Sequence, residues 1–259
     1  MSDPAPRKYG RRTILGTVAA TTIGAPFLGN SLAEAAAVLR WNPVPSRDGL
    51  NAFEGVEDDR ANSHPEATHI YISGETYRFT MHTRDRDGSD RQRNEVRGMR
   101  TTGGSVLNWL SGETWQVTYD MFIPSTLRGT TSFTHIFQLK KPGTGTDPLA
   151  TVGLRRSGSN EYMTLRPFLS GGEIGRVALS SVWNSWIQID MTFKIGNSGS
   201  GRFVVKKNGS TLTDASRSGI DLWLSESIRP KWGIYRSLDD SAQLKDTYLQ
   251  IRNLKGYKL

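Results

Sequence analysis

The chain has 259 residues, no cysteine and a formal net charge of +8 at pH 7. The lack of cysteine excludes disulfides and thiolate chemistry, so a hydrophobic core has to supply the stability. The excess of Lys and Arg suits an acidic partner such as a nucleic acid, an anionic lipid or an anionic polysaccharide, and is also compatible with ordinary solubility.

Residues 1–37 have the pattern of a twin-arginine signal peptide. Arg11 and Arg12 precede a modestly apolar stretch, and small residues follow at 33–37 as an expected cleavage site. The stretch is interrupted by Gly and Thr, and it falls short of the roughly 20 apolar residues that a transmembrane helix needs. We therefore expect export by the Tat pathway, no membrane span in the mature chain, and a single domain over residues 38–259.

Loss of residues 1–35 leaves a net charge of +6 on the mature chain. Outside the cytoplasm, an anionic polysaccharide is a more accessible acidic partner than nucleic acid. We therefore expect a secreted monomer, extracellular or periplasmic, that binds an anionic polysaccharide and no nucleic acid.

The rest of the chain consists of short segments rich in Val, Ile, Thr and aromatic residues, separated by turn clusters. Strands are predicted over residues 68–73, 76–82, 94–99, 115–123, 132–139, 162–168, 186–195, 201–206, 231–235 and 248–254. Asn208-Gly209 predicts a tight hairpin turn. No stretch longer than ten residues has a helical period. The pattern predicts an all-β domain, a jelly-roll-like sandwich of two antiparallel sheets.

The segment 91–97 is the first that could carry chemistry. In a strand, alternate side chains share a face, so Arg93, Glu95 and Arg97 are expected to lie together. Two guanidinium groups with a carboxylate between them would form a rigid cationic platform suited to carboxylate ligands. The alternative is a solvated strand face whose charges neutralise one another.

The segment 134–140 is the second. Alternation places Gln138 and Lys140 on one face, and His135 on the opposite face with Phe137 and Leu139. That second face is the expected core, so we interpret His135 as a hydrogen-bonded buried histidine rather than a catalyst. A single β-bulge would reverse this assignment.

The third segment, 229–236, places Lys231 and Tyr235 on one face with Gly233 between them. Positive charge near a phenol favours its ionised form, so Lys231 and the adjacent Arg236 are expected to make Tyr235 a better base. The alternative is an edge-strand tyrosine that packs on a neighbouring side chain.

Taken together, the three segments resemble the jelly-roll polysaccharide lyases, the group of alginate lyases, heparin lyase I and glucuronan lyases. Those enzymes carry an Arg-x-Glu-x-Arg strand, a Gln-Ile-His strand and a Lys-x-x-x-Tyr strand on the concave face of one sheet. The matching residues occur here in the same order and are Arg93, Glu95, Arg97, Gln138, Lys140, Lys231 and Tyr235. The segment 230–236 looks most similar to the heparin- and glucuronan-lyase branch.

The resemblance implies β-elimination at a 4-linked uronate, with no cofactor required. It implies catalytic roles for Tyr235, Lys231 and Gln138, with Tyr235 moving protons and Gln138 helping to stabilise the intermediate. The substrate-binding residues it implies are Arg93, Asn94, Glu95, Arg97, Lys140 and Arg236.

One departure concerns Lys140, which stands where the alginate lyases have a histidine. Either another histidine serves, with His82 as the first candidate because it precedes the arginine strand, or Tyr235 alone carries both proton transfers. A binding protein with a degraded site is a third reading.

Two other classes remain open. A non-catalytic carbohydrate-binding sandwich would stack sugars on Trp183, Trp186, Trp223 or Trp232. A glycoside hydrolase is less expected, because no strand carries a Glu-x-Asp-x-x-Glu pattern.

No metal site is expected, because no histidines occur at metal-ligand spacing. The acidic run Glu54, Glu57, Asp58 and Asp59 could hold a structural calcium ion, but a solvated loop is the better expectation.

Overall fold

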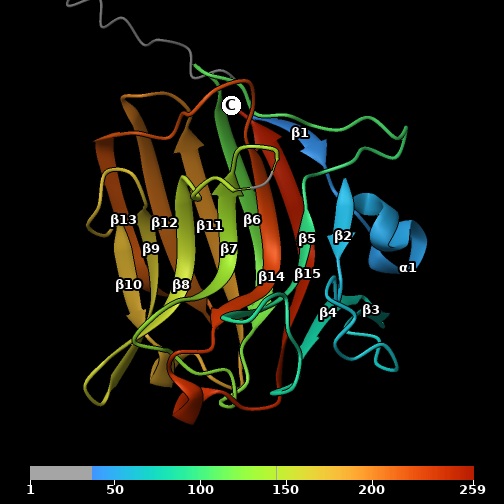
Figure 1. Cartoon of the computed structure of the whole chain (residues 1–259). Coiled ribbons are helices and arrows are strands. Elements are labelled where there is room, and N and C mark those ends of the chain that lie inside the picture. The colour runs from blue at the N-terminus through green and yellow to red at the C-terminus, as the bar shows by residue number, and fades with distance from the viewer. Residues whose placement is uncertain (1–36, 144) are drawn as a thin grey trace, which may run out of the picture. The chain divides into compact units, whose positions relative to one another are not determined.

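The computed structural model of the chain describes residues 37–143 and 145–259. Apart from Ala37, the predicted signal peptide lies outside these residues. The described residues form two antiparallel sheets stacked face to face, as the two layers of arrows in Figure 1 show. The predicted all-β sandwich is confirmed. No helix in the described part of the chain is long and apolar enough to cross a membrane.

The larger sheet has eight strands and forms one layer of the sandwich. Seven of them run in the order β13-β12-β11-β6-β15-β4-β3, and β1 pairs with β15. The strands are β1 (Val38–Trp41), β3 (Ile70–Ser73), β4 (Thr76–Met81), β6 (Thr114–Phe122), β11 (Trp186–Lys194), β12 (Gly199–Lys207), β13 (Ser210–Ile220) and β15 (Thr247–Lys258).

The smaller sheet has seven strands in the order β10-β9-β8-β7-β14-β5-β2. They are β2 (Gly55–Glu57), β5 (Arg91–Arg97), β7 (Thr134–Lys140), β8 (Ala150–Ser157), β9 (Asn160–Pro167), β10 (Gly175–Ala178) and β14 (Arg229–Ser237). Four short helical turns complete the described chain: α1 (Pro45–Asp48), η1 (Gly49–Ala52), η2 (Leu179–Ser181) and η3 (Ser241–Gln243).

All ten predicted strands overlap a strand of the structure. The predicted hairpin is also confirmed, because Asn208 and Gly209 connect β12 to β13 with φ angles of 49° and 80°. Strands β1, β2, β8, β10 and β13 were not predicted. They are short or lack the alternation of apolar residues, and β13 is mostly polar and exposed, so pairing with neighbours defines them more than their own composition does.

Aromatic side chains from both sheets fill the space between the layers. Trp232 of β14 is fully buried, stacks on Trp41 at a centroid distance of 5.4 Å, and meets Phe137 edge-on at 5.7 Å. Aromatic residues bury large apolar areas, so this cluster contributes strongly to stability. Its position also makes Trp232 part of the core rather than a sugar-stacking platform.

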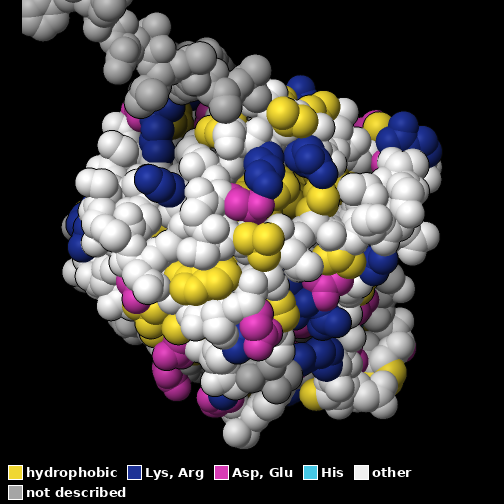
Figure 2. All heavy atoms as spheres, turned by 90° about the horizontal axis from the view of Figure 1, so that it is seen from above, with side chains coloured by type: hydrophobic (Ala, Val, Ile, Leu, Met, Phe, Trp, Pro, Cys, Tyr) yellow, Lys and Arg dark blue, Asp and Glu magenta, His cyan; other side chains and the backbone are white. Residues whose placement is uncertain are grey.

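Seen from above, Lys and Arg side chains and Asp and Glu side chains are scattered over a surface that is mostly uncharged, with some Lys and Arg groups side by side (Figure 2).

Candidate active site

A groove of about 630 Å³ lies over the seven-stranded sheet, above β5, β14 and β7. Its lining residues are Glu57, Arg60, Asp87, Arg91, Arg93, Arg97, Phe133, His135, Gln138, Lys140, Gly143, Gly145, Thr146, Asp147, Pro148, Phe168, Arg229, Lys231 and Tyr235. Seven of them are Lys or Arg and three are Asp or Glu, a net charge of +4. The groove therefore attracts anions.

A second hollow, of about 550 Å³, lies against the eight-stranded sheet. Three carboxylates and two lysines line it, so its net charge is −1. Tyr119, the tyrosine of this hollow, is only 3% exposed, and burial raises its pKa well above the ordinary value. The negative charge of this hollow disfavours an anionic ligand, and its buried tyrosine is poorly suited to acid–base chemistry.

The pairing of β5 with β14 brings two of the predicted motifs together. Arg93 lies opposite Tyr235, Glu95 opposite Gly233, and Arg97 opposite Lys231. Gly233 is required here because its φ is +140° and a Cβ atom would lie 2.2 Å from the carbonyl oxygen of Asn94. The expected common face of Arg93, Glu95 and Arg97 is confirmed.

Two carboxylates hold the floor of the groove together. The ammonium of Lys231 lies 2.9 Å from Glu57 Oε2 and 2.7 Å from Glu95 Oε2, and the amide of Gln138 donates to Glu95 Oε1 at 2.6 Å. Lys231, Glu95 and Gln138 are almost completely buried. Lys231 and Glu95 therefore position neighbouring groups, because their charges are already satisfied within the protein.

Glu57 is the second acidic centre of this network. Burial alone would raise the pKa of its carboxyl, but Lys231 and then Arg93 outweigh burial and lower the pKa to about 2. Arg93 and Arg97 each donate a hydrogen bond of 3.2 Å to Glu57. Because a glycosidase acid must keep its proton near neutral pH, this ionised carboxylate cannot serve as the acid of a paired-carboxylate hydrolase.

Tyr235 projects into the groove between cations and aromatic rings. Arg91 donates a hydrogen bond of 3.0 Å to its phenol oxygen, and the guanidinium of Arg93 lies 3.9 Å from its ring centroid. The rings of Phe133 and His135 lie 4.9 and 5.9 Å from the Tyr235 ring. The phenol thus combines access to the groove with hydrogen bonding from a fixed cation.

His135 is buried as expected, with 9% of its surface exposed, but the expectation that it faces the core is wrong. Its ring lines the groove and stacks on Phe133 at 5.2 Å, although Gln138, three positions further along the strand, lines the same groove. Irregular pairing causes this: β7 shifts register against β8 between His135 and Phe137, and β14 shifts register against β7 between Trp232 and Tyr235. A β-bulge reverses the alternation of side chains beyond it.

Lys140 reaches the groove as the strand alternation predicts, and its ammonium contacts the carbonyl oxygen of Thr146. Burial, followed by the positive charges of Lys231 and Arg93, lowers the pKa of Lys140. The protein itself therefore neutralises this cation incompletely, and a bound anion would improve its surroundings.

Two predicted substrate-binding residues face away from the groove. Asn94 is buried and donates to the Thr80 carbonyl at 2.9 Å, whereas Arg236 is buried and donates to Gln92 Oε1 at 2.6 Å. Asn94 on β5 and Arg236 on β14 directly follow Arg93 and Tyr235, so their side chains point to the other face of the sheet. The prediction that Asn94 and Arg236 reach the substrate, and that Arg236 flanks the phenol, is therefore wrong.

His82 also lies outside the groove lining. It is grouped with His64, His69 and Asp85 beyond the end of β4. The suggestion that His82 provides the missing catalytic histidine is therefore not supported by its place in the fold, whereas His135 stands beside Tyr235.

The acidic run considered for calcium is dispersed among protein partners. Glu54 pairs with Arg229, Glu57 belongs to the groove network, Asp58 contacts His69, and Asp59 accepts hydrogen bonds from Ser63. Carboxylates that point to separate partners do not form the shared oxygen shell that Ca²⁺ needs.

The groove residues that sequence reasoning missed include Glu57, Arg91 and His135. Arg91 lies two positions before Arg93 on β5 and shares its face, but the predicted strand began at residue 94. Glu57 occupies a three-residue strand with no periodic signal, and the bulges concealed His135.

The fold is similar to that of solved polysaccharide lyases. Alginate lyase A1-II', a member of polysaccharide lyase family 7, matches with a TM-score of 0.56 and 15% identity over 83% of this chain and 99% of that one. A variant of A1-II' in complex with substrate matches with a TM-score of 0.55 and 14% identity over 83% and 96%. Alginate lyase PA1167 from Pseudomonas aeruginosa matches with a TM-score of 0.52 and 14% identity over 80% and 98%.

No protein-family model and no curated protein matches the sequence. The likeness therefore concerns the arrangement of strands rather than the sequence as a whole. At that level the resemblance drawn from the three motifs is confirmed: the chain has the β-sandwich fold of the jelly-roll polysaccharide lyases.

Proposed function

We propose that this chain is a secreted polysaccharide lyase that cleaves a uronate-containing polymer by β-elimination. The observation that carries the proposal is one groove that combines a net charge of +4 with Tyr235, whose phenol oxygen accepts a hydrogen bond from Arg91. The fold shared with alginate lyases supports the same conclusion.

The positive groove selects the substrate class. Each uronate carries one carboxylate, so a polymer presents regularly spaced negative charges to Lys140, Arg97 and the neighbouring cations. Lys140 is the best candidate to pair with the carboxylate of the reacting sugar, because the protein neutralises it incompletely. Neutralising that carboxylate makes the adjacent C5 proton more acidic and stabilises the enolate-like intermediate.

Gln138 has a more limited role in this scheme. One amide hydrogen bond is used on Glu95 at 2.6 Å, which fixes the orientation of the side chain. The second N–H is available to the carboxylate of the substrate. Gln138 therefore binds substrate, while Lys231 positions the carboxylates beneath it.

Tyr235 carries the proton transfers. The phenolate takes the C5 proton, the electrons of that bond form the C4–C5 double bond, and the C4–O4 bond breaks. The same phenol then gives a proton to the departing O4, so atoms and charge balance over the cycle. Arg91 offsets the negative charge on the phenol oxygen while its proton is absent.

His135 is the other groove residue able to accept a proton. Burial and then the positive charge of Arg155 lower its pKa to about 3, so it is a neutral imidazole at pH 7. A base this weak has little driving force to remove a C5 proton. We therefore assign proton abstraction to Tyr235 and a positioning role to the His135 ring that packs beside it.

Export remains part of the proposal. The paired arginines and small-residue site of residues 1–37 support a Tat signal. An exported lyase would meet its polymer outside the cytoplasm, where polyuronates occur as bulk material.

The decisive experiment compares Tyr235→Phe with Tyr248→Phe on a panel of polyuronates, reading the ultraviolet absorbance of the unsaturated product. Tyr248 is a matched control, because Arg78 lies 3.7 Å over its ring just as Arg93 lies over Tyr235, but on the other sheet. We expect Tyr235→Phe to lower kcat by about 10³-fold or more, with polymer binding retained.

Two results would contradict the proposal. Full activity of Tyr235→Phe would remove the assigned acid and base. Tight polymer binding by the wild type without unsaturated product would make the chain a carbohydrate-binding protein instead.

A further inference from the structure

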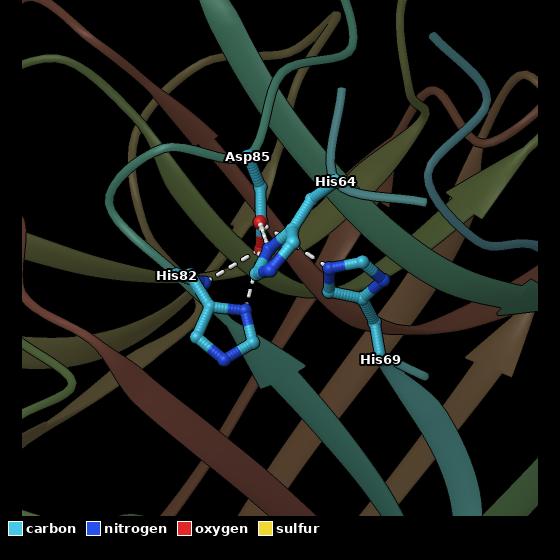
Figure 3. Close-up of side chains that lie close together, drawn as sticks. All are labelled: His64, His69, His82 and Asp85. Carbon is cyan, nitrogen blue, oxygen red and sulfur yellow. Dashed lines mark hydrogen bonds and ion pairs between the residues drawn. The ribbon is translucent and has the colours of Figure 1, made fainter. Parts of the chain in front are cut away.

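Three of the four histidines of the chain meet around one carboxylate, away from the groove (Figure 3). Asp85 Oδ1 lies 2.7 Å from His64 Nδ1 and 3.2 Å from His69 Nε2, and Asp85 Oδ2 lies 3.4 Å from His82 Nδ1. The four ligand atoms lie within 4.8 Å of one another. Since the residues span positions 64 to 85 without regular spacing, only the fold assembles them.

The hydrogen bonds of His69 direct one bare nitrogen toward this centre. His69 is fully buried, and its Nδ1 lies 2.8 Å from Asp58 Oδ1. On the other side of the ring, His69 Nε2 lies 3.2 Å from Asp85 Oδ1, yet the described residues offer it no hydrogen bond. A buried polar atom without a hydrogen bond is unfavourable, and a cation shared with Asp85 would satisfy it.

We propose that His64, His69, His82 and Asp85 bind a Zn²⁺ ion. Three imidazole nitrogens and one carboxylate oxygen suit zinc in both ligand type and number. Zinc–ligand bonds of about 2.0–2.1 Å in a tetrahedron place ligand atoms about 3.3–3.4 Å apart. The 3.2 Å separation between His69 Nε2 and Asp85 Oδ1 matches this spacing. His64 Nδ1 lies 2.7 Å from the same oxygen and would move outward when the ion binds. Asp58 orients His69 as an outer carboxylate commonly orients a metal-bound histidine.

The site is structural rather than catalytic. Four protein ligands fill a tetrahedral shell, and His64, His69 and Asp85 are nearly inaccessible to solvent. The ion joins the loop after β2 to the loop between β4 and β5. The latter loop carries Asp87, which lies 3.1 Å from Arg93 Nε, so zinc would hold one wall of the groove in place from behind.

The experiment uses the protein purified without a polyhistidine tag, stripped with a chelator and titrated with Zn²⁺. We expect one equivalent of zinc per chain and a rise in melting temperature of roughly 5–10 °C at a hundredfold excess over Kd. Co²⁺ should give the intense visible absorption of a tetrahedral site. Ca²⁺ should leave the melting temperature unchanged, because nitrogen donors disfavour it.

Variants locate the ion. His64→Gln and His82→Gln should raise Kd at least about tenfold, and Asp58→Asn, which keeps the acceptor but loses the charge, by roughly 10–100-fold. His135→Gln, at the one histidine outside the cluster, should bind zinc like the wild type. Equal binding by all variants, loss of binding only in His135→Gln, or no zinc binding by the wild type would overturn the proposal. The cobalt spectrum of the wild type tests it without any variant.

Discussion

Replacing Glu57 by Gln removes the carboxylate that joins β2 to the cations of the groove. The side chain keeps its shape but loses its charge and one acceptor oxygen, so it can no longer accept from Lys231, Arg93 and Arg97 together. The pKa of Glu57 falls from 4.5 to about 2 in the folded protein, which corresponds to about 3 kcal/mol of stabilisation at pH 7. We expect Glu57→Gln to lose a free energy of unfolding of about this size.

The pH dependence follows from the direction of the pKa change. Because the folded carboxyl binds a proton less tightly than the unfolded one, its stabilisation is complete above pH 4.5 and is lost as the pH falls toward 2. The difference in unfolding free energy between wild type and Glu57→Gln should therefore be about 3 kcal/mol at pH 7 and less than half of that at pH 3.

Urea denaturation at several pH values measures both quantities. Glu75→Gln is the matched control, because Glu75 is exposed in the turn between β3 and β4 and should change stability little. A gap between wild type and Glu57→Gln that stays constant from pH 7 to pH 3 would refute the ion-pair reasoning, and so would equal stability at pH 7.

Three further predictions concern the groove. Gly233→Ala should lower the free energy of unfolding by about 3 kcal/mol or more, because its Cβ would lie 2.2 Å from a carbonyl oxygen of β5. Gly209→Ala, with open space around it, should lower it by about 1 kcal/mol. Equal losses of the two variants in denaturation curves would contradict this. Lys140→Met should raise KM for a polyuronate without lowering the free energy of unfolding. Burial and Lys231 lower the pKa of Lys140, so its charge does not stabilise the folded protein. An unchanged KM would remove Lys140 from the binding site. KM of the wild type should rise steeply with added NaCl, since the screening length shrinks from about 10 Å at 0.1 M to about 3 Å at 1 M; a flat salt profile would argue against charge-driven binding.

Much of the groove was predictable because strand alternation is a local property. Arg93, Glu95 and Arg97 occupy alternate positions of β5, and Lys231 and Tyr235 do the same on β14. Each set therefore shares a face wherever the strand lies in the sheet. The predicted motifs meet in one groove because β7, β14 and β5 are neighbours, as they are expected to be in a jelly-roll lyase.

The same local rule could not say which residues the other strands bring near. Glu57 comes from a three-residue strand whose pairing with β5 alone brings it to Lys231. Such contacts depend on the pairing of distant segments, which no local periodicity reports.

The sequence by itself determined the fold class, ten of the strands, the tight hairpin at Asn208-Gly209 and the common face of the arginine strand, because all of these depend on side-chain alternation and turn chemistry within a few residues. Only the tertiary structure decided that His135 faces the groove and that His64, His69, His82 and Asp85 meet at one point. The physical reason is that bulges alter strand register by one residue, and loop packing joins side chains whose spacing in the sequence carries no period.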